Sequence, residues 1–213
     1  MYALSIINNS LVSCEGQVIA IVPGNSDAAH SSAYLHLFAT APELLKCLEA
    51  KVSSALETIT KQLLPSPTLT GYRGYSGGRA FPNPPDWVEG FMNIIAFAYG
   101  EKSIIDKEEL KLSISEMEAN AIENEDSEIV IRLSSKLSAV EADKYIHLFC
   151  AAPVMLESVE AIAKNAMTEI DREYKSGVEF DALGADASRF IIPDELRNVC
   201  NLVARARGVA RMS

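Results

Sequence analysis

The most regular pattern of apolar and polar residues in this chain has the three- and four-residue spacing of an α-helix. One apolar stripe of this kind covers residues 37–63, and a second covers residues 148–170. Apolar side chains at this spacing lie on one face of a helix, and such a face is normally buried against the rest of the fold. The pattern therefore predicts two long helices that contribute to the core.

A proline interrupts each stripe, Pro42 in the first and Pro153 in the second. Proline lacks an amide donor and its ring crowds the preceding turn, so each helix is expected either to kink there or to end and restart. Thr40 and Glu43 have the spacing of a capping box, which would suit a restart in the first stripe. The second stripe lacks such residues, so we predict a kink or a tight joint in both.

Short strand candidates precede each stripe. They lie at residues 2–7 and 17–22, and again at residues 111–114 and 128–133. Turn-forming residues separate the first two candidates, and an acidic stretch separates the second two. A hairpin is the simplest arrangement of each pair, although residues 117–122 fit a helix as well.

A second helical pattern follows each stripe, over residues 86–99 and 194–207. Both patterns begin at an aspartate suited to the N-cap and end before a glycine suited to the C′ position, namely Asp86, Asp194, Gly100 and Gly208. The first copy is apolar almost all round, which predicts burial on several sides. The second copy carries three arginines, so it is expected to keep an exposed face.

The same elements thus occur twice along the chain. Residues 34–42 return 111 residues later with six of nine positions identical, and the pattern over residues 86–100 returns after 108 residues. Such spacing indicates an internal repeat. We therefore predict an α+β fold of two tandem ββαα units, the first helix of each kinked, related by a pseudo-two-fold axis with helices packed in a shared core. The repeat units, 1–105 and 106–213, are expected to form one pseudo-dimeric body.

Charge and cysteine content narrow the classes of partner. The formal net charge is −10, and residues 106–213 hold 21 acidic and 13 basic side chains. An acidic surface repels phosphate backbones, which argues against direct nucleic-acid binding, but acidity also suits solubility or a basic partner. The four cysteines have no metal-ligand spacing, so a reduced cytosolic protein without a metal or cofactor is expected. No signal peptide or apolar run of membrane-spanning length is present, so no membrane segment is expected.

The segment 65–85 is the strongest candidate for binding chemistry. Glycines free its backbone, tyrosines offer flat faces and arginines offer forked donors for phosphate or carboxylate. That composition suits a nucleotide-like small molecule or an acidic peptide, although no established phosphate-loop spacing is present. The alternative is an ordered loop that packs its aromatic side chains against the body. The candidate ligand-binding residues here are Tyr72, Arg73, Tyr75, Arg79 and Phe81, with Trp87 just beyond.

His36 and His147 occupy the same place in the two units. They lie on the helix flank away from the apolar stripe, so they are candidates to approach each other or to bind a ligand; the alternative is a hydrogen-bonded interface role. The sequence contains no recognisable catalytic constellation such as a nucleophile elbow or HExxH. We therefore predict no catalytic residues, which argues against an enzyme.

Residues 37–45, Leu-Phe-Ala-Thr-Ala-Pro-Glu-Leu-Leu, resemble a motif of small phage and prophage proteins. That motif runs roughly Asn-Ala-Arg-Leu-Ile-Ala-Ala-Ala-Pro-Glu-Leu-Leu after a short strand. The second unit repeats the match at Leu148, Ala151, Ala152, Pro153 and Leu156. Both units depart from the family's Asn and Arg, so the roles of those residues do not carry over to Tyr34, His36, Tyr145 and His147. The resemblance implies an accessory phage product in the bacterial cytoplasm and no known reaction.

Three functional hypotheses follow. The first is a non-enzymatic phage binding protein that blunts a host defence by holding a host protein or by sequestering a nucleotide signal. The second is an acidic structural, assembly or nucleic-acid-mimic protein that engages a basic partner, with self-association left open. The third is a hydrolase that acts at Arg73 and Arg79 together with His36 or His147.

Overall fold

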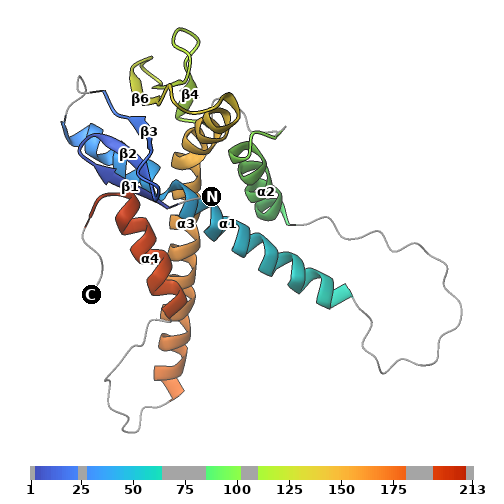
Figure 1. Ribbon diagram of the computed structural model, residues 1–213. Coiled ribbons are helices and arrows are strands. Elements are labelled where there is room, and N and C mark those ends of the chain that lie inside the picture. Colours follow the sequence, from blue (N-terminus) through green and yellow to red (C-terminus); the bar gives the residue numbers. More distant parts are fainter. Residues whose placement is uncertain (1–2, 24–27, 64–84, 102–109, 181–193, 210–213) are drawn as a thin grey trace, which may run out of the picture.

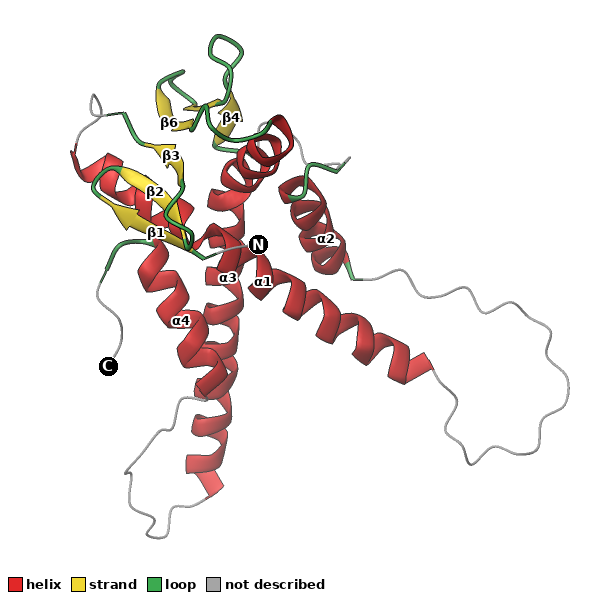
Figure 2. Ribbon diagram, viewed as in Figure 1, coloured by secondary structure: helices red, strands yellow, loops and turns green. Residues whose placement is uncertain are grey.

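The computed structural model describes residues 3–23, 28–63, 85–101, 110–180 and 194–209. Within these residues the chain forms a six-stranded antiparallel sheet and four helices, so the predicted α+β class is confirmed. Figures 1 and 2 show the sheet at one end of the molecule, while the C-terminal ends of the two long helices point away from it in different directions.

One continuous sheet collects strands from both halves of the chain. Its order is β1-β2-β3-β6-β5-β4, with every neighbouring pair antiparallel. The halves meet where Ala20 of β3 pairs with Leu133 of β6. The strands are β1 (Leu4–Ile7), β2 (Ser10–Ser13), β3 (Val18–Ile21), β4 (Leu112–Ile114), β5 (Ala121–Asn124) and β6 (Ile129–Leu133).

The prediction of two strands in each half is wrong, because β2 and β5 lie in stretches that the sequence pattern marked as connections. Asn8 has a left-handed backbone with φ of 53°, which lets β1 turn back into β2 within two residues. A register irregularity in β2 leaves Leu11 and Val12 both buried, so this strand lacks the apolar alternation that identifies strands in a sequence. The helical alternative for residues 117–122 is also wrong, since β5 begins at residue 121.

The two long helices are α1 (Ala28–Leu63) and α3 (Ala139–Phe180), and each continues through its proline. The restart at Pro42 is therefore wrong, whereas the kink stays a prediction. Thr40 does not cap a new helix: its hydroxyl donates to the carbonyl oxygens of His36 and Leu37 at 2.9 and 3.0 Å. Buried residues on both sides of each proline hold the helix in place through tertiary packing.

The two short helices are α2 (Asp86–Ala98) and α4 (Asp194–Ala206). Asp86 is the first helical residue and Pro85 precedes it, so the predicted aspartate N-cap is wrong for α2. Glycine at C′ is confirmed in both helices, with φ of 76° and 68°. Burial of α2 on several sides is wrong, because its N-terminal turns overhang the core and leave Trp87 44% exposed. The buried residues are Val88, Ile94 and Ala98 in α2 and Leu196, Leu202 and Ala206 in α4.

A single hydrophobic cluster contains residues from the sheet and from all four helices. At its centre the rings of Phe38 (α1) and Phe149 (α3) lie with their centroids 5.0 Å apart, and neither ring is exposed to solvent. Helix α2 packs on both long helices, and so does α4. Each short helix therefore contacts the long helix of the other half of the chain as well as its own.

Candidate functional site

The candidate site residue His147 lies where the end of α2 meets α3. The edge of its ring faces Phe97, with ring centroids 5.3 Å apart, and a Cβ atom at Gly100 would come within 3.1 Å of its Cδ2 atom. Nε2 of His147 lies 3.6 Å from Oδ1 of Asp143, and its buried Nδ1 atom has no hydrogen-bond partner in the described part of the chain. This joint is aromatic and filled.

His36 lies where the end of α4 meets α1. A Cβ atom at Gly208 would come within 2.8 Å of the His36 Cδ2 atom. Beside the histidine is a hollow of ≈ 420 Å³ that β1, α1 and α4 line together. Here Arg205 of α4 holds the Glu43 carboxylate of α1 through both terminal guanidinium nitrogens, with Nη1 3.1 Å from Oε1. This joint is polar and partly open.

The Glu43–Arg205 pair also borders a second hollow of ≈ 550 Å³, which Lys46, Asn198 and Asn201 help to line. Basic, acidic and amide groups therefore lie along the groove between α1 and α4. The sequence did not indicate this groove, because the contact joins residues 162 positions apart.

The two histidines contact different helices, His36 at the end of α4 and His147 at the end of α2. Among the described residues no hydrogen bond, ion pair or ring contact joins them, so the structure gives no support to a histidine pair across the two units. Tyr72, Arg73, Tyr75, Arg79 and Phe81 lie outside the described residues, so the loop hypothesis stays a prediction.

Trp87 is the one loop-associated candidate that the structure describes. It lies in the first turn of α2 with its ring edge-on to Phe91 at a centroid distance of 5.5 Å. Met92 of the same helix is 45% exposed. Charged residues of α2 are acidic only, Asp86 and Glu89. An exposed aromatic residue with an acidic border is thus the main surface feature of this helix.

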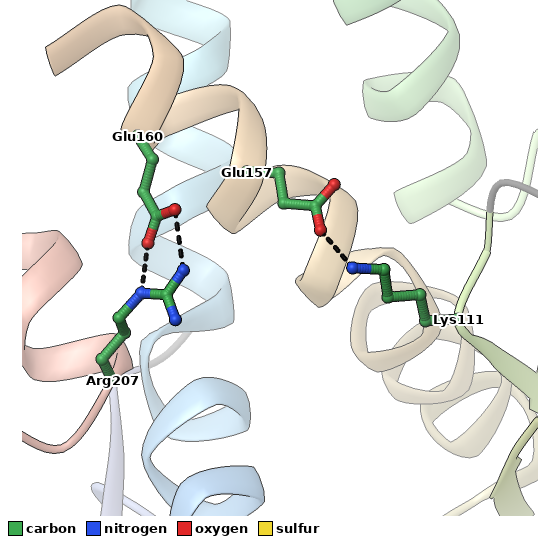
Figure 3. Close-up of polar contacts among 4 residues, drawn as sticks. All are labelled: Lys111, Glu157, Glu160 and Arg207. Carbon is green, nitrogen blue, oxygen red and sulfur yellow. Dashed lines mark hydrogen bonds and ion pairs between the residues drawn. The ribbon is translucent and has the colours of Figure 1, made fainter. Parts of the chain in front are cut away.

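Two polar contacts tie the ends of the short helices to the long helix of the same half. The Tyr99 hydroxyl donates to Glu49 at 2.6 Å, and this bond to a carboxylate raises the pKa of Tyr99 to about 12. Arg207 donates to Glu160 through Nε and Nη2, which raises the pKa of the guanidinium (Figure 3). The sequence analysis missed both contacts. The signal for them was the repeat spacing, since 99 and 207 differ by 108 and 49 and 160 by 111.

One more ion pair links the sheet to α3. Lys111, at the start of β4, donates to Glu157, which lies one turn before Glu160 on the same helix (Figure 3). This contact raises the pKa of the Lys111 ammonium. Both groups are more than half exposed, so the pair contributes little to stability.

Metal and thiol chemistry find no support in the described residues. No group of three histidine, cysteine or acidic side chains there has a metal-binding arrangement. All four cysteines are free, and burial raises the pKa of the Cys150 thiol to about 12. A nucleophilic cysteine needs a thiolate near neutral pH, which this environment opposes.

The segment Ala139–Glu169 of α3 is long and apolar enough to cross a membrane by length and composition, although the sequence expectation was no such segment. Of its most apolar window, 61% is buried inside the protein. The core helix of a globular protein has the same character. Comparison with protein-family models, curated proteins and solved structures finds no match to this chain.

Proposed function

We propose that this chain is a non-enzymatic binding protein that docks a protein partner on the exposed side of α2 around Trp87. The observation that carries the proposal is a large aromatic residue, 44% exposed, on a helix whose other exposed residues include Met92. Tryptophan is the residue type most enriched among interface positions that dominate binding energy. Single exposed apolar residues are common, so the proposal depends on the cluster and its charged border.

A comparison with α4 favours α2 as the binding helix. At the positions equivalent to Trp87, Phe97 and Tyr99, α4 and the residue after its C-cap carry Glu195, Arg205 and Arg207. The two arginines form ion pairs within the protein, so the corresponding part of α4 is committed to internal contacts. Helix α2 keeps an apolar surface that makes no such use of charge.

The acidic residues of α2 indicate the chemistry of the partner. Asp86 and Glu89 border the aromatic pair of Trp87 and Phe91, and α2 has no basic residue. A complementary surface would have an apolar pocket for the indole ring and lysine or arginine around it. This combines the host-protein and basic-partner hypotheses into one.

We also infer that the gene arose by duplication, which makes the chain a fused pseudo-dimer with a two-fold axis between β3 and β6. Both halves have the same element order, three strands, a long helix and a 13-residue helix. Every buried residue of α2 has a buried counterpart 108 residues later in α4. The hydrogen bond from the backbone N of residue 22 to the oxygen of Asn9, 2.9 Å, has its counterpart from residue 133 to Asn120, 2.8 Å.

The phage origin and the action in the bacterial cytoplasm remain part of this proposal and rest on the motif at residues 37–45. The nucleotide-sequestering and hydrolase alternatives depend on Arg73 and Arg79. Docking through α2 is favoured because its residues lie within the described structure.

The experiment uses the chain's single tryptophan as its own reporter. Immobilised protein captures partners from a bacterial host lysate, and the purified partner is then titrated against free protein while Trp87 emission is recorded. Burial of the indole should shift the emission to shorter wavelength, and higher salt should weaken the affinity because the contact is charge-assisted.

The test variant is Trp87→Glu, and the control is Met117→Glu, which adds the same charge at a side chain that is 95% exposed on another element. Truncated tryptophan anchors cost more than about tenfold in affinity. We expect at least that loss for Trp87→Glu and none for the control. A partner that both variants bind equally, or a lysate that yields no specific partner, contradicts docking at α2.

A further inference from the structure

A hollow of ≈ 440 Å³ lies where the end of α2, the start of α3 and the β2–β3 hairpin meet. We propose that it is a binding site for a small zwitterion, namely a free amino acid with an aromatic or other apolar side chain. The volume is within the range of small-molecule sites in proteins. This site is separate from the docking surface, because Trp87 does not line it.

The floor and walls of the hollow suit an apolar group. Ile19 of β3 and Ala98 of α2 are 2% and 1% exposed, so they are fixed in the core and present only a small apolar surface to the space. The Tyr145 ring packs against Phe149 at a centroid distance of 5.7 Å, and the Tyr99 hydroxyl is held by Glu49. Both aromatic walls are therefore positioned before a ligand arrives, which lowers the entropy cost of binding.

Three polar groups at the rim, Glu15, Gln17 and Lys144, make no side-chain hydrogen bond or ion pair within the described part of the chain. The hairpin that carries Glu15 and Gln17 is fixed, because the Ser13 hydroxyl oxygen accepts from both of their backbone N–H groups at 3.3 and 3.2 Å. One carboxylate, one amide and one ammonium thus surround an apolar space. An amino acid matches this set, with its carboxylate on Lys144 and its ammonium on Glu15.

The remaining charged group, Glu141, is already in use. Its Oε2 atom accepts from the backbone N and the hydroxyl of Ser138 at 3.0 and 2.6 Å, as in a helix capping box. These hydrogen bonds from Ser138 lower the pKa of Glu141, so this carboxylate keeps its negative charge. With two carboxylates and one ammonium around it, the hollow disfavours a polyphosphate. A nucleotide is therefore the wrong ligand for this site.

The corresponding place in the other half has a different character. The residue equivalent to Lys144 is Ala33, and the residues equivalent to Gln17 and Glu15 are Glu128 and Asp126. Burial raises the pKa of Tyr34 there, and so do these nearby carboxylates. Without a cation on the helix, that place cannot hold the carboxylate of an amino acid. The ligand site is therefore expected in one half only.

Isothermal titration calorimetry of the full chain tests the proposal with four probes: L-phenylalanine, L-phenylalanine amide, 3-phenylpropionate and AMP. We expect L-phenylalanine to bind, and the two analogues that each lack one charge to bind about tenfold more weakly, since hydrogen bonds to charged groups are worth about that factor. AMP should bind more weakly than either. Equal affinity for all three phenyl compounds, or no heat from L-phenylalanine at millimolar concentration, overturns the proposal.

Two variants locate the site. Lys144→Met should weaken L-phenylalanine about tenfold and leave its amide unchanged, while Glu15→Gln should weaken both amine-bearing probes and leave 3-phenylpropionate unchanged. Lys136→Met, at an exposed turn outside the hollow, is the control. Trp87→Glu should bind L-phenylalanine normally, which separates this test from that of partner docking. Identical losses in Lys144→Met and Lys136→Met would overturn the assignment.

Discussion

The two short helices of this protein end in the same way, but they rest on different surfaces. Helices α2 and α4 both finish at a glycine whose amide bonds back into the helix, Gly100 to Phe97 and Gly208 to Arg205, at 2.9 and 3.0 Å. Each glycine lies against a histidine of the other half. Next to that contact, α2 places an aromatic ring on α3, whereas α4 places a guanidinium group on α1.

This difference shows which parts of the joint tolerate change. The glycine and the histidine lie so close together that a larger residue at the glycine has no room, and both occur in both joints. One position earlier in the geometry, Phe97 fills the first joint, while Arg205 and Glu43 leave the second beside a hollow of ≈ 420 Å³. Under the proposed duplication, the close contact was kept and the adjacent packing diverged.

The largest effect is expected where the two halves are most alike, at Phe38 and Phe149. Both rings are completely buried and touch each other at the centre of the core. Phe38→Ala and Phe149→Ala should each lower the free energy of unfolding by about 3–5 kcal/mol, as large-to-small core substitutions do. Urea denaturation of the two variants measures this, and the double variant should lose less than the sum because the rings share one contact.

A clear difference between these two variants would contradict a common core with equal contributions from both halves. Leu56→Ala provides the control, since this α1 residue is apolar but 37% exposed and should cost much less. Additive losses in the double variant would show that the ring contact itself contributes nothing.

A smaller effect distinguishes the two joints. Alanine at either glycine must adopt a left-handed backbone, which costs about 1–2 kcal/mol. Gly100→Ala also presses on His147, which Phe97 confines, whereas Gly208→Ala presses on His36, which can turn into the hollow. We therefore expect Gly100→Ala to cost about 1 kcal/mol more, a typical penalty for overpacking.

Chemical denaturation of both glycine variants gives the comparison, and His147→Ala provides the matched test. In the Gly100→Ala background the removal of the imidazole should recover the extra loss, although the backbone strain remains. A greater loss for Gly208→Ala would mean that the shorter contact, 2.8 Å against 3.1 Å, outweighs the room beside His36.

Much of the fold could be predicted from the sequence, because helices with an apolar stripe and caps of glycine are determined locally. The long helices and the C′ positions of Gly100 and Gly208 agree with the pattern. The strands β2 and β5 could not be predicted, since a bulge places Leu11 and Val12 together in the core and removes the alternation. The Asp86 N-cap was wrong because Pro85 already supplies the extended residue before the helix.

The candidate site was less predictable, because its contacts join elements distant in sequence. Arg205 and Glu43 meet only when α4 lies on α1, and the hollow at Lys144 needs the β2–β3 hairpin, α2 and α3 together. Trp87 was recognised from its residue type, but its exposure follows from the overhang of the first turn of α2, which no local pattern encodes.

The smallest effect concerns the contacts of the two helix ends with their own long helices. Tyr99 loses its proton at high pH, whereas the guanidinium of Arg207 keeps its charge. In the unfolded chain a tyrosine has a pKa near 10, and the bond to Glu49 raises the pKa of Tyr99 to about 12 in the folded protein. The folded state therefore binds more protons between these values, so stability from this bond is fully present below pH 10 and is lost as the pH rises to 12.

Thermal or urea unfolding at several pH values should show this loss in the wild-type protein and a flatter profile in Tyr99→Phe, with a difference below about 1 kcal/mol because both partners are exposed. Glu160→Gln removes the equivalent Arg207 contact and should lower stability by the same amount at pH 8 and at pH 11, since Arg207 stays charged across that range. If Tyr99→Phe declines as steeply as the wild type, the Tyr99–Glu49 bond does not contribute to the alkaline loss, and the two helix ends are held with equal indifference to pH.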